Sequence, residues 1–265
     1  MSVTRRALAL VLSALVLGAT APAAWADQLA DIKAARKIRI AVAMGIPRFA
    51  FVDAALQPTG SDVETARMIA KDLGVALDLV QITNAARVPT IQTRKADILV
   101  ASLAVTPERK KVIDFTVPYA TLNIIVAGAK GVAVKGYPDI VGKRIGVTRA
   151  TVNDMLVTQN AKGAEIVRFE DDATLITAAV SGQVDLVSTQ EAVVAVMNEK
   201  RPDRPFEVKF VQSELNLGIA LPQGEDALKS WLNEWVKTNV ANGRLTTMFR
   251  KFHERDLPAD LTSRN

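Results

Sequence analysis

Short apolar segments alternate with amphipathic helical patterns along this chain, and the connections between them are short. Three segments in the first half have the length and composition of buried strands, at residues 38–42, 77–82 and 97–101. Between them lie helical patterns over 61–73 and 87–93. A capping box of Ser61 and Glu64 is expected to open the first of these helices, and Gly74 is expected to end it as a left-handed C-cap. Strands that alternate with helices in this way favour an α/β fold with a mostly parallel sheet.

The same alternation starts again after Gly131. Strands are expected at 143–147, 164–169, 184–187 and 207–211. Helices are expected at 151–159 and 172–181, and a third helix is expected to run from a capping box at Ser188 and Glu191 to Asn198. The apolar extended segments 122–127 and 215–221 flank this unit, which predicts two crossings between two lobes. The helical tail 225–251 is expected to pack back on the first lobe. We therefore expect lobe 1 to comprise 27–127 and 220–265, and lobe 2 to comprise 128–219.

Residues 1–26 have the features of a cleavable signal peptide. Arg5 and Arg6 precede an uncharged apolar run over 7–19, and a small-x-small site ends at Ala26. The run is shorter than a membrane-spanning helix requires. We expect export to the periplasm with cleavage after Ala26, by either the general or the twin-arginine route. The chain has no cysteine, which excludes disulfides, a lipid anchor on cysteine and thiol catalysis.

The charge of the mature chain gives little support to nucleic-acid binding. The formal net charge is +5, and removing Arg5 and Arg6 leaves 31 − 28 = +3, spread along the sequence. His253 is the single histidine, and we expect it at the surface of the tail. No spacing typical of a metal site or of a known catalytic motif occurs, so we predict no metal, no cofactor and no catalytic residue.

The segment around Arg109 has the chemistry of an anion site. Thr106 offers an N-cap hydroxyl and Pro107 the first position of a helix that follows the strand 97–101. Arg109 lies in that first turn, where its guanidinium and the free backbone N–H groups can bind a carboxylate together with Ser102. The alternative is a surface arginine paired with Glu108 or Asp114.

Five segments together resemble the bacterial extracellular solute-binding proteins of the polar amino acid type, which serve ABC importers. They are GSDVETA at 60–66, IQTRKAD at 91–97, TPER at 106–109, DFTVPY at 114–119 and GVTRAT at 146–151. The resemblance covers nearly all of the mature chain. It implies a two-lobed type II clamshell with two hinge strands, a small-molecule ligand between the lobes, an inner-membrane ABC permease as partner, and a monomer.

The resemblance also implies roles for individual residues. Arg109 resembles the arginine that binds the α-carboxylate of the ligand. Ser102 and Ala104 resemble the turn that donates to the same group, although Ala104 retains only its amide. Thr151 resembles the residue that donates to the carboxylate from lobe 2, and it is also a plain N-cap.

Four positions depart from the family pattern. Ile46 and Ser61 stand where the family has the aromatic residues that clamp the ligand. Ala43 and Gln190 stand where it has the acids that bind the ligand ammonium. Glu191 is adjacent and is a candidate replacement, although Ser188 and Glu191 also form a capping box.

These departures leave the ligand class open between an amino acid and an amine-free organic acid. Asn84, Arg87 and Arg149 stand in the loops from which the family builds its specificity pocket, and each arginine is also interpretable as a surface charge. The main alternative function is a periplasmic lyase resembling the cyclohexadienyl dehydratases, for which Glu191 is the candidate proton donor. A sensory clamshell is a third hypothesis.

Overall fold

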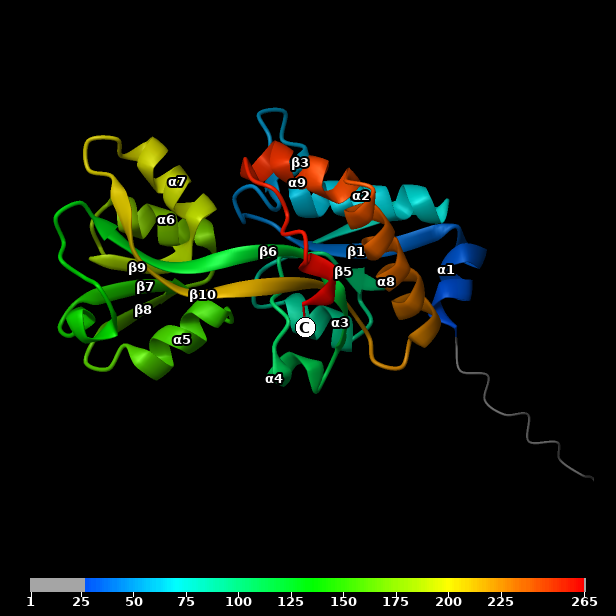
Figure 1. Ribbon diagram of the computed structural model, residues 1–265, viewed down its shortest axis with the longest axis horizontal. Helices are drawn as coiled ribbons and strands as arrows, with labels where there is room; N and C mark the ends of the chain where they lie inside the picture. The colour runs from blue at the N-terminus through cyan, green and yellow to red at the C-terminus, as the bar shows by residue number, and fades with distance from the viewer. Residues whose placement is uncertain (1–26, 265) are drawn as a thin grey trace, which may run out of the picture.

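The computed structural model describes residues 27–264 and has two lobes joined by two long strands (Figure 1). Its main sheet has eight strands in the order β4-β1-β5-β10-β6-β9-β7-β8. The strands are β1 (Lys37–Ala43), β2 (Phe51–Val52), β3 (Pro58–Thr59), β4 (Ala76–Ile82), β5 (Ile98–Leu99), β6 (Asp114–Ala129), β7 (Arg144–Thr148), β8 (Glu165–Phe169), β9 (Leu186–Gln190) and β10 (Phe206–Leu221). The predicted α/β clamshell is confirmed, with a sheet that is mixed rather than parallel throughout.

Helices cover the sheet in both lobes. The α-helices are α1 (Gln28–Ala35), α2 (Ser61–Leu73), α3 (Arg87–Gln92), α4 (Pro107–Lys110), α5 (Val152–Asn160), α6 (Asp172–Val180), α7 (Glu191–Lys200), α8 (Asp226–Ala241) and α9 (Arg244–His253), and two short 3₁₀ segments span Tyr137–Ile140 and Leu261–Ser263. In Figure 1, α5, α6 and α7 surround the strands of lobe 2, while the remaining α-helices belong to lobe 1.

The strands β6 and β10 are the connection between the lobes. They pair antiparallel along their length, from Phe206 opposite Ala129 to Leu221 opposite Asp114. On the lobe 1 side β10 meets β5, and on the lobe 2 side β6 meets β9. Within each lobe the other strands run parallel, β4-β1-β5 in one and β9-β7-β8 in the other. Both predicted crossings therefore belong to one two-stranded ribbon.

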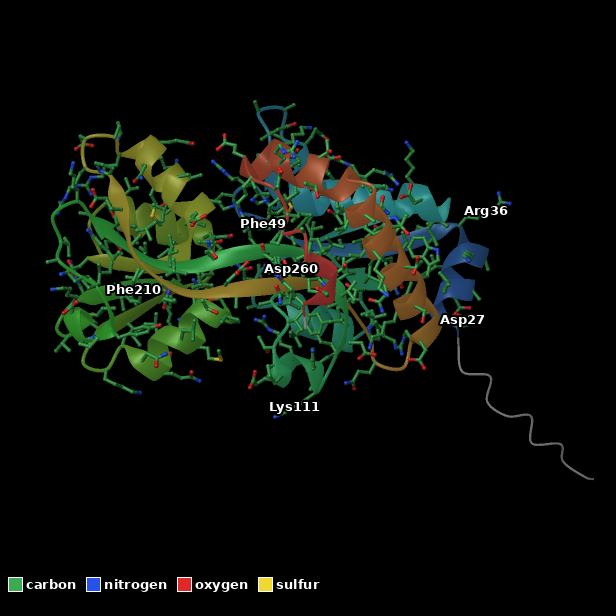
Figure 2. All side chains as sticks on the ribbon, in the orientation of Figure 1. Asp27, Arg36, Phe49, Lys111, Phe210 and Asp260 are labelled. Carbon is green, nitrogen blue, oxygen red and sulfur yellow. The ribbon has the colours of Figure 1, made fainter. Side chains whose placement is uncertain are left out.

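Buried apolar side chains form separate clusters in the two lobes. One cluster unites Ile38 and Ile69 from the first half of the chain with Leu228 and Phe249 from the tail. Two smaller clusters lie in lobe 2, on the two faces of its sheet. Along β6 the change from the lobe 1 cluster to those of lobe 2 falls between Ile124 and Ile125. Figure 2 labels Phe49 in lobe 1 and Phe210 in lobe 2.

Two predicted capping boxes are absent. Ser61 is the first residue of α2, and the N-cap is Gly60, which has a φ of +118° and no side chain to cap the helix. Ser188 lies inside β9, and α7 begins at Glu191 with Gln190 as its N-cap. In both places the predicted N-cap lies one or two residues from the observed N-cap. The local sequence pattern shows that a helix begins nearby, but it does not show where the preceding strand or loop ends.

The tail differs from the single predicted helix. The chain forms α8 and α9 with a break at Asn242 and Gly243, and Gly243 adopts a left-handed φ of +77°. The break lets both helices lie against lobe 1, where Leu232 and Leu245 are fully buried. Residues 1–26, which carry the predicted signal peptide, lie outside the described residues.

Candidate ligand-binding cleft

A cleft between the lobes is lined from both sides by the ends of parallel strands. In lobe 1 it is reached by the segments that follow β1, β4 and β5, and in lobe 2 by the segments that follow β7 and β8 and by the last residues of β9. The carboxyl ends of parallel strands are the usual place for a ligand in an α/β protein. Six of the eight predicted site residues line this cleft, namely Ile46, Ser102, Ala104, Arg109, Thr151 and Gln190.

Arg109 is held at the start of α4 as predicted. The Thr106 hydroxyl accepts a hydrogen bond from the backbone N–H of Arg109 at 3.3 Å. The guanidinium donates to the Ala104 carbonyl at 2.8 Å and, across the cleft, to the Ala150 carbonyl of lobe 2 at 3.3 Å. Within residues 27–264 Arg109 takes part in no salt bridge, and Asp114 pairs instead with Lys229 at 3.2 Å. Burial lowers the pKa of Arg109 to about 10, so its positive charge is poorly solvated.

Arg87 is a second arginine in the cleft, and it is 5% exposed. Its guanidinium donates to the carbonyls of Asn84 at 3.0 Å, Ala101 at 3.3 Å and, in lobe 2, Ala150 at 3.5 Å. Burial, followed by the nearby charge of Arg109, lowers the pKa of Arg87 to about 9. The interpretation of Arg87 as a surface charge is therefore wrong.

The turn after β5 is fixed by a buried chain of hydrogen bonds. Ser102 has a left-handed φ of +43°, and its backbone N–H donates to the Tyr119 hydroxyl at 3.1 Å. That hydroxyl donates to Asp62 at 2.7 Å. Asp62 is fully buried, and the loss of hydration raises its pKa to about 7. This chain supports the Ser102 carbonyl, which faces Arg87.

In lobe 2 the last residue of β7 is Thr148, and Thr151 follows it at the start of α5. Thr151 is the N-cap of α5, because its hydroxyl accepts from the Asp154 N–H at 3.2 Å, and the same hydroxyl donates to the Thr148 carbonyl at 2.6 Å. The Thr148 hydroxyl donates to Asp172 at 2.5 Å. Asp172 is 7% exposed and lines the cleft, and burial raises its pKa.

Asp172 is the charged cleft residue that the sequence analysis does not identify. Asp172 follows Asp171 at the start of a predicted helix, and adjacent acids at this place indicate only helix capping. What brings it to the cleft is the pairing of β7 with β8, in which Thr148 stands opposite Phe169. No local signal in the sequence reports that register.

Two predicted site residues lie away from the cleft. The Ser61 side chain is buried, and its hydroxyl shares a hydrogen bond of 2.9 Å with His253. Arg149 is half-exposed and forms a salt bridge of 2.7 Å with Glu170. Glu191, the candidate replacement acid, is exposed beside Asn123 in a neighbouring pocket.

His253 is buried, which corrects the expectation of a surface residue. Its ring stacks on Phe249 with centroids 4.0 Å apart and lies at a tilt against Phe49 at 4.4 Å. Burial, with further effects of Arg255 and Arg48, lowers its pKa to about 3. The histidine is therefore neutral in the folded protein at physiological pH.

No helix over 27–264 combines the length and apolar character needed to cross a membrane. No group of three or more His, Cys, Asp or Glu side chains over the same residues is arranged to hold a metal ion.

The family of the chain follows from comparison with known proteins. The sequence profile of the bacterial extracellular solute-binding proteins, family 3, matches residues 38–255, which include the whole cleft. This chain belongs to that family. The solute-binding protein thus has a cleft between its lobes in which a solute can be enclosed.

Relatives of this solute-binding protein agree with the assignment in both sequence and fold. The ABC transporter glutamine-binding protein of Bacillus subtilis is 27% identical over 205 residues, covering 76% of this chain and 74% of its own. A mutant of ArgBP from T. maritima superposes with a TM-score of 0.80 at 27% identity, over 86% of this chain and all of the other. An ancestral amino acid-binding protein, a precursor of cyclohexadienyl dehydratase, superposes with a TM-score of 0.78 at 29% identity, over 84% and 98%.

Proposed function

We propose that this solute-binding protein captures an amino acid or a related small carboxylate in the periplasm and delivers it to an ABC permease. The observation that carries the proposal is Arg109, a poorly solvated guanidinium in the cleft with no carboxylate partner among the described residues. A carboxylate that enters the cleft supplies that partner. The names of the relatives, which bind glutamine or arginine, support an amino acid as the ligand.

Ligand binding is expected to favour the closed arrangement of the lobes. Arg109 in lobe 1 and the residues Thr151 and Asn153 in lobe 2 line the cleft, so one carboxylate between them contacts both lobes. The Thr151 hydroxyl already donates to the Thr148 carbonyl, so the donor that the family resemblance assigns to its side chain is used within lobe 2. A ligand that binds the closed form better than the open form shifts the equilibrium toward closure. The Ala150 carbonyl of lobe 2 accepts hydrogen bonds from Arg87 and Arg109 of lobe 1. The two lobes therefore already contact each other beside Thr151.

Export and assembly are part of the same proposal. The family comprises extracellular proteins, and the sequence of residues 1–26 supports export to the periplasm with cleavage after Ala26. We propose that the mature protein acts as a monomer, since it must present its lobes alternately to solvent and to a permease.

The test of this proposal is Arg109→Ala in the signal-free protein, measured by isothermal titration calorimetry against a panel of amino acids and their amine-free acids. Removing one partner of a buried charge pair costs about 2–5 kcal/mol, so binding of the best ligand should weaken by at least about thirtyfold. Arg149→Ala is the matched control, because it removes an arginine that lies outside the cleft. Unchanged affinity in Arg109→Ala contradicts the proposal.

A lyase remains the second candidate function. It is favoured by the buried acid Asp172 in the cleft and by the likeness to a precursor of cyclohexadienyl dehydratase. In that case Asp172 replaces Glu191 as the candidate proton donor, since a raised pKa suits a general acid. Turnover of prephenate or arogenate by the purified protein, abolished in Asp172→Asn, decides for the lyase.

A further inference from the structure

Asp172 and Asn84 face the cleft from opposite lobes at corresponding places in the sheet. Asn84 follows β4 and Asp172 follows β8, and these two strands are the edges of the main sheet. Both residues line the cleft. They therefore follow the two strands that are farthest, in strand order, from the connecting strands β6 and β10.

The Asp172 carboxylate is oriented but only partly satisfied. Thr148 donates to Oδ1, and the other oxygen receives no hydrogen bond from any described residue. The charge of Arg87 acts on Asp172 across the cleft, yet the two are not within salt-bridge distance. Arg87 donates instead to backbone carbonyls, including those of Asn84 and Ala101. A carboxylate held in this way retains acceptor capacity for a further donor.

Asn84 supplies a second acceptor without a partner. Its side chain is 5% exposed, and its Oδ1 is buried with no hydrogen bond over residues 27–264. A buried acceptor left unpaired costs about 1–3 kcal/mol, which a donor from a ligand can recover. The cleft thus offers unused acceptors on both sides as well as the donors of Arg109.

The donor of lobe 1 and the acid of lobe 2 contact the same short segment of lobe 2. Arg109 contacts Ala150 and Asp172 contacts Thr148, which lie two residues apart at the end of β7. Over the described residues Asp172 is the only carboxylate side chain that lines the cleft. Burying an ammonium group without a compensating charge is costly, so an amino acid needs this acid.

We propose that Asp172, oriented by Thr148, binds the α-ammonium group of the ligand together with the side-chain oxygen of Asn84. The inference rests on the proposed function, because it requires that Arg109 binds the carboxylate of the same molecule. It narrows the ligand from a small carboxylate to one that carries an amine, and it makes Asp172 a specificity-determining residue.

The experiment compares Asp172→Asn with wild type by isothermal titration calorimetry. The probes are the common L-amino acids and, for each that binds, the same molecule without its α-amino group, such as glutarate for L-glutamate. Asp172→Asn should weaken binding of the amino acid at least about tenfold and change binding of the amine-free acid less than about threefold. Thr148→Val should weaken amino acid binding in the same sense by a smaller factor, because it only releases the carboxylate from its fixed orientation.

Two further variants make the result decisive. Asp171→Asn, at the adjacent acid, keeps the N-cap of α6 and should leave the affinity for both compounds unchanged. Asn84→Leu leaves Asp172 in place and removes the other acceptor. It should also weaken binding of the amino acid more than binding of the amine-free acid, and it tests the inference if Asp172→Asn does not fold.

Three outcomes overturn the inference. Equal losses for the amino acid and its amine-free analogue in Asp172→Asn mean that the residue only maintains the fold of the cleft. Unchanged amino acid affinity in Asp172→Asn refutes the role of Asp172. The same conclusion follows if wild type prefers amine-free acids and Arg109→Ala abolishes their binding. Both outcomes leave the proposed function intact. Binding of neither class by wild type refutes both.

Discussion

Two buried groups of lobe 1 should give the stability of this protein opposite dependences on pH. His253 has a pKa of about 3 in the folded protein, below the 6.5 of an unperturbed histidine. The unfolded chain therefore takes up the proton first as the pH falls, and stability is lost from about pH 6.5 downward. Asp62 has a pKa of about 7, above its ordinary 3.8. The folded protein takes up that proton first, so stability is gained as the pH falls through 7.

The two effects are of similar size between pH 8 and pH 5. From the cited pKa values, lowering the pH over this interval removes roughly 2 kcal/mol of stability through His253. Over the same interval Asp62 adds roughly 2.5 kcal/mol. The sum is close to zero, so wild type should change little on account of this pair, although each group alone produces a large slope.

Single variants separate the two slopes. His253→Gln retains a group that can hydrogen-bond to Ser61 but does not titrate, so its stability should rise relative to wild type by roughly 2 kcal/mol on going from pH 8 to pH 5. Asp62→Asn keeps an acceptor for Tyr119 and should fall relative to wild type by roughly 2.5 kcal/mol. The measurement is the free energy of unfolding in urea at pH 5, 6, 7 and 8 for proteins that comprise residues 27–265.

The change with pH is the observable, because each substitution also shifts stability by an amount that is independent of pH. Asp172, whose pKa is raised in the same direction as that of Asp62, is present in all three proteins and cancels in the comparison. Parallel profiles for His253→Gln and wild type would refute the burial of a neutral histidine. Parallel profiles for Asp62→Asn and wild type would do the same for the protonation of Asp62.

Two further substitutions test the packing of lobe 1 by urea unfolding. Gly60→Ala should destabilise the protein by more than about 2 kcal/mol, because the new Cβ would stand 2.3 Å from the Phe49 carbonyl oxygen at a φ of +118°. Gly45→Ala, also at positive φ but with no atom within 4 Å, should cost only about 1 kcal/mol, and equal costs would contradict the steric argument. Trp235→Phe removes the 2.8 Å hydrogen bond to Asp72 and should cost about 1 kcal/mol; no loss would mean that this bond contributes nothing.

Much of the fold was predictable because the signals that set it are local. Gly74 ends α2 in the predicted left-handed conformation, and Thr106 caps α4 as its sequence indicates. The strands β1, β4, β7 and β8 lie within one or two residues of their predicted limits. The length of β6 was not predicted, because Pro118 interrupts the apolar pattern and the pairing with β10 extends the strand through it.

The site was predictable where a residue stands in a motif and not where long-range packing decides its surroundings. Arg109 and Thr151 lie in the cleft because short capping motifs position them. Ser61 was misplaced because its hydroxyl is taken by His253, 192 residues away in sequence. Arg87 is buried only because carbonyls of both lobes surround it, a circumstance that no window of sequence contains.

The lobe 1 core contains side chains from both ends of the described chain, with Ile38 from β1 packed in the same cluster as Leu245 and Phe249 from α9. A ribosome synthesises these residues at very different times. Lobe 2 draws most of its clusters from a contiguous stretch and can form early, whereas lobe 1 cannot close its core until α9 has been made. The nascent chain therefore stays incompletely folded until its last helix is complete, a condition compatible with threading through a secretion channel.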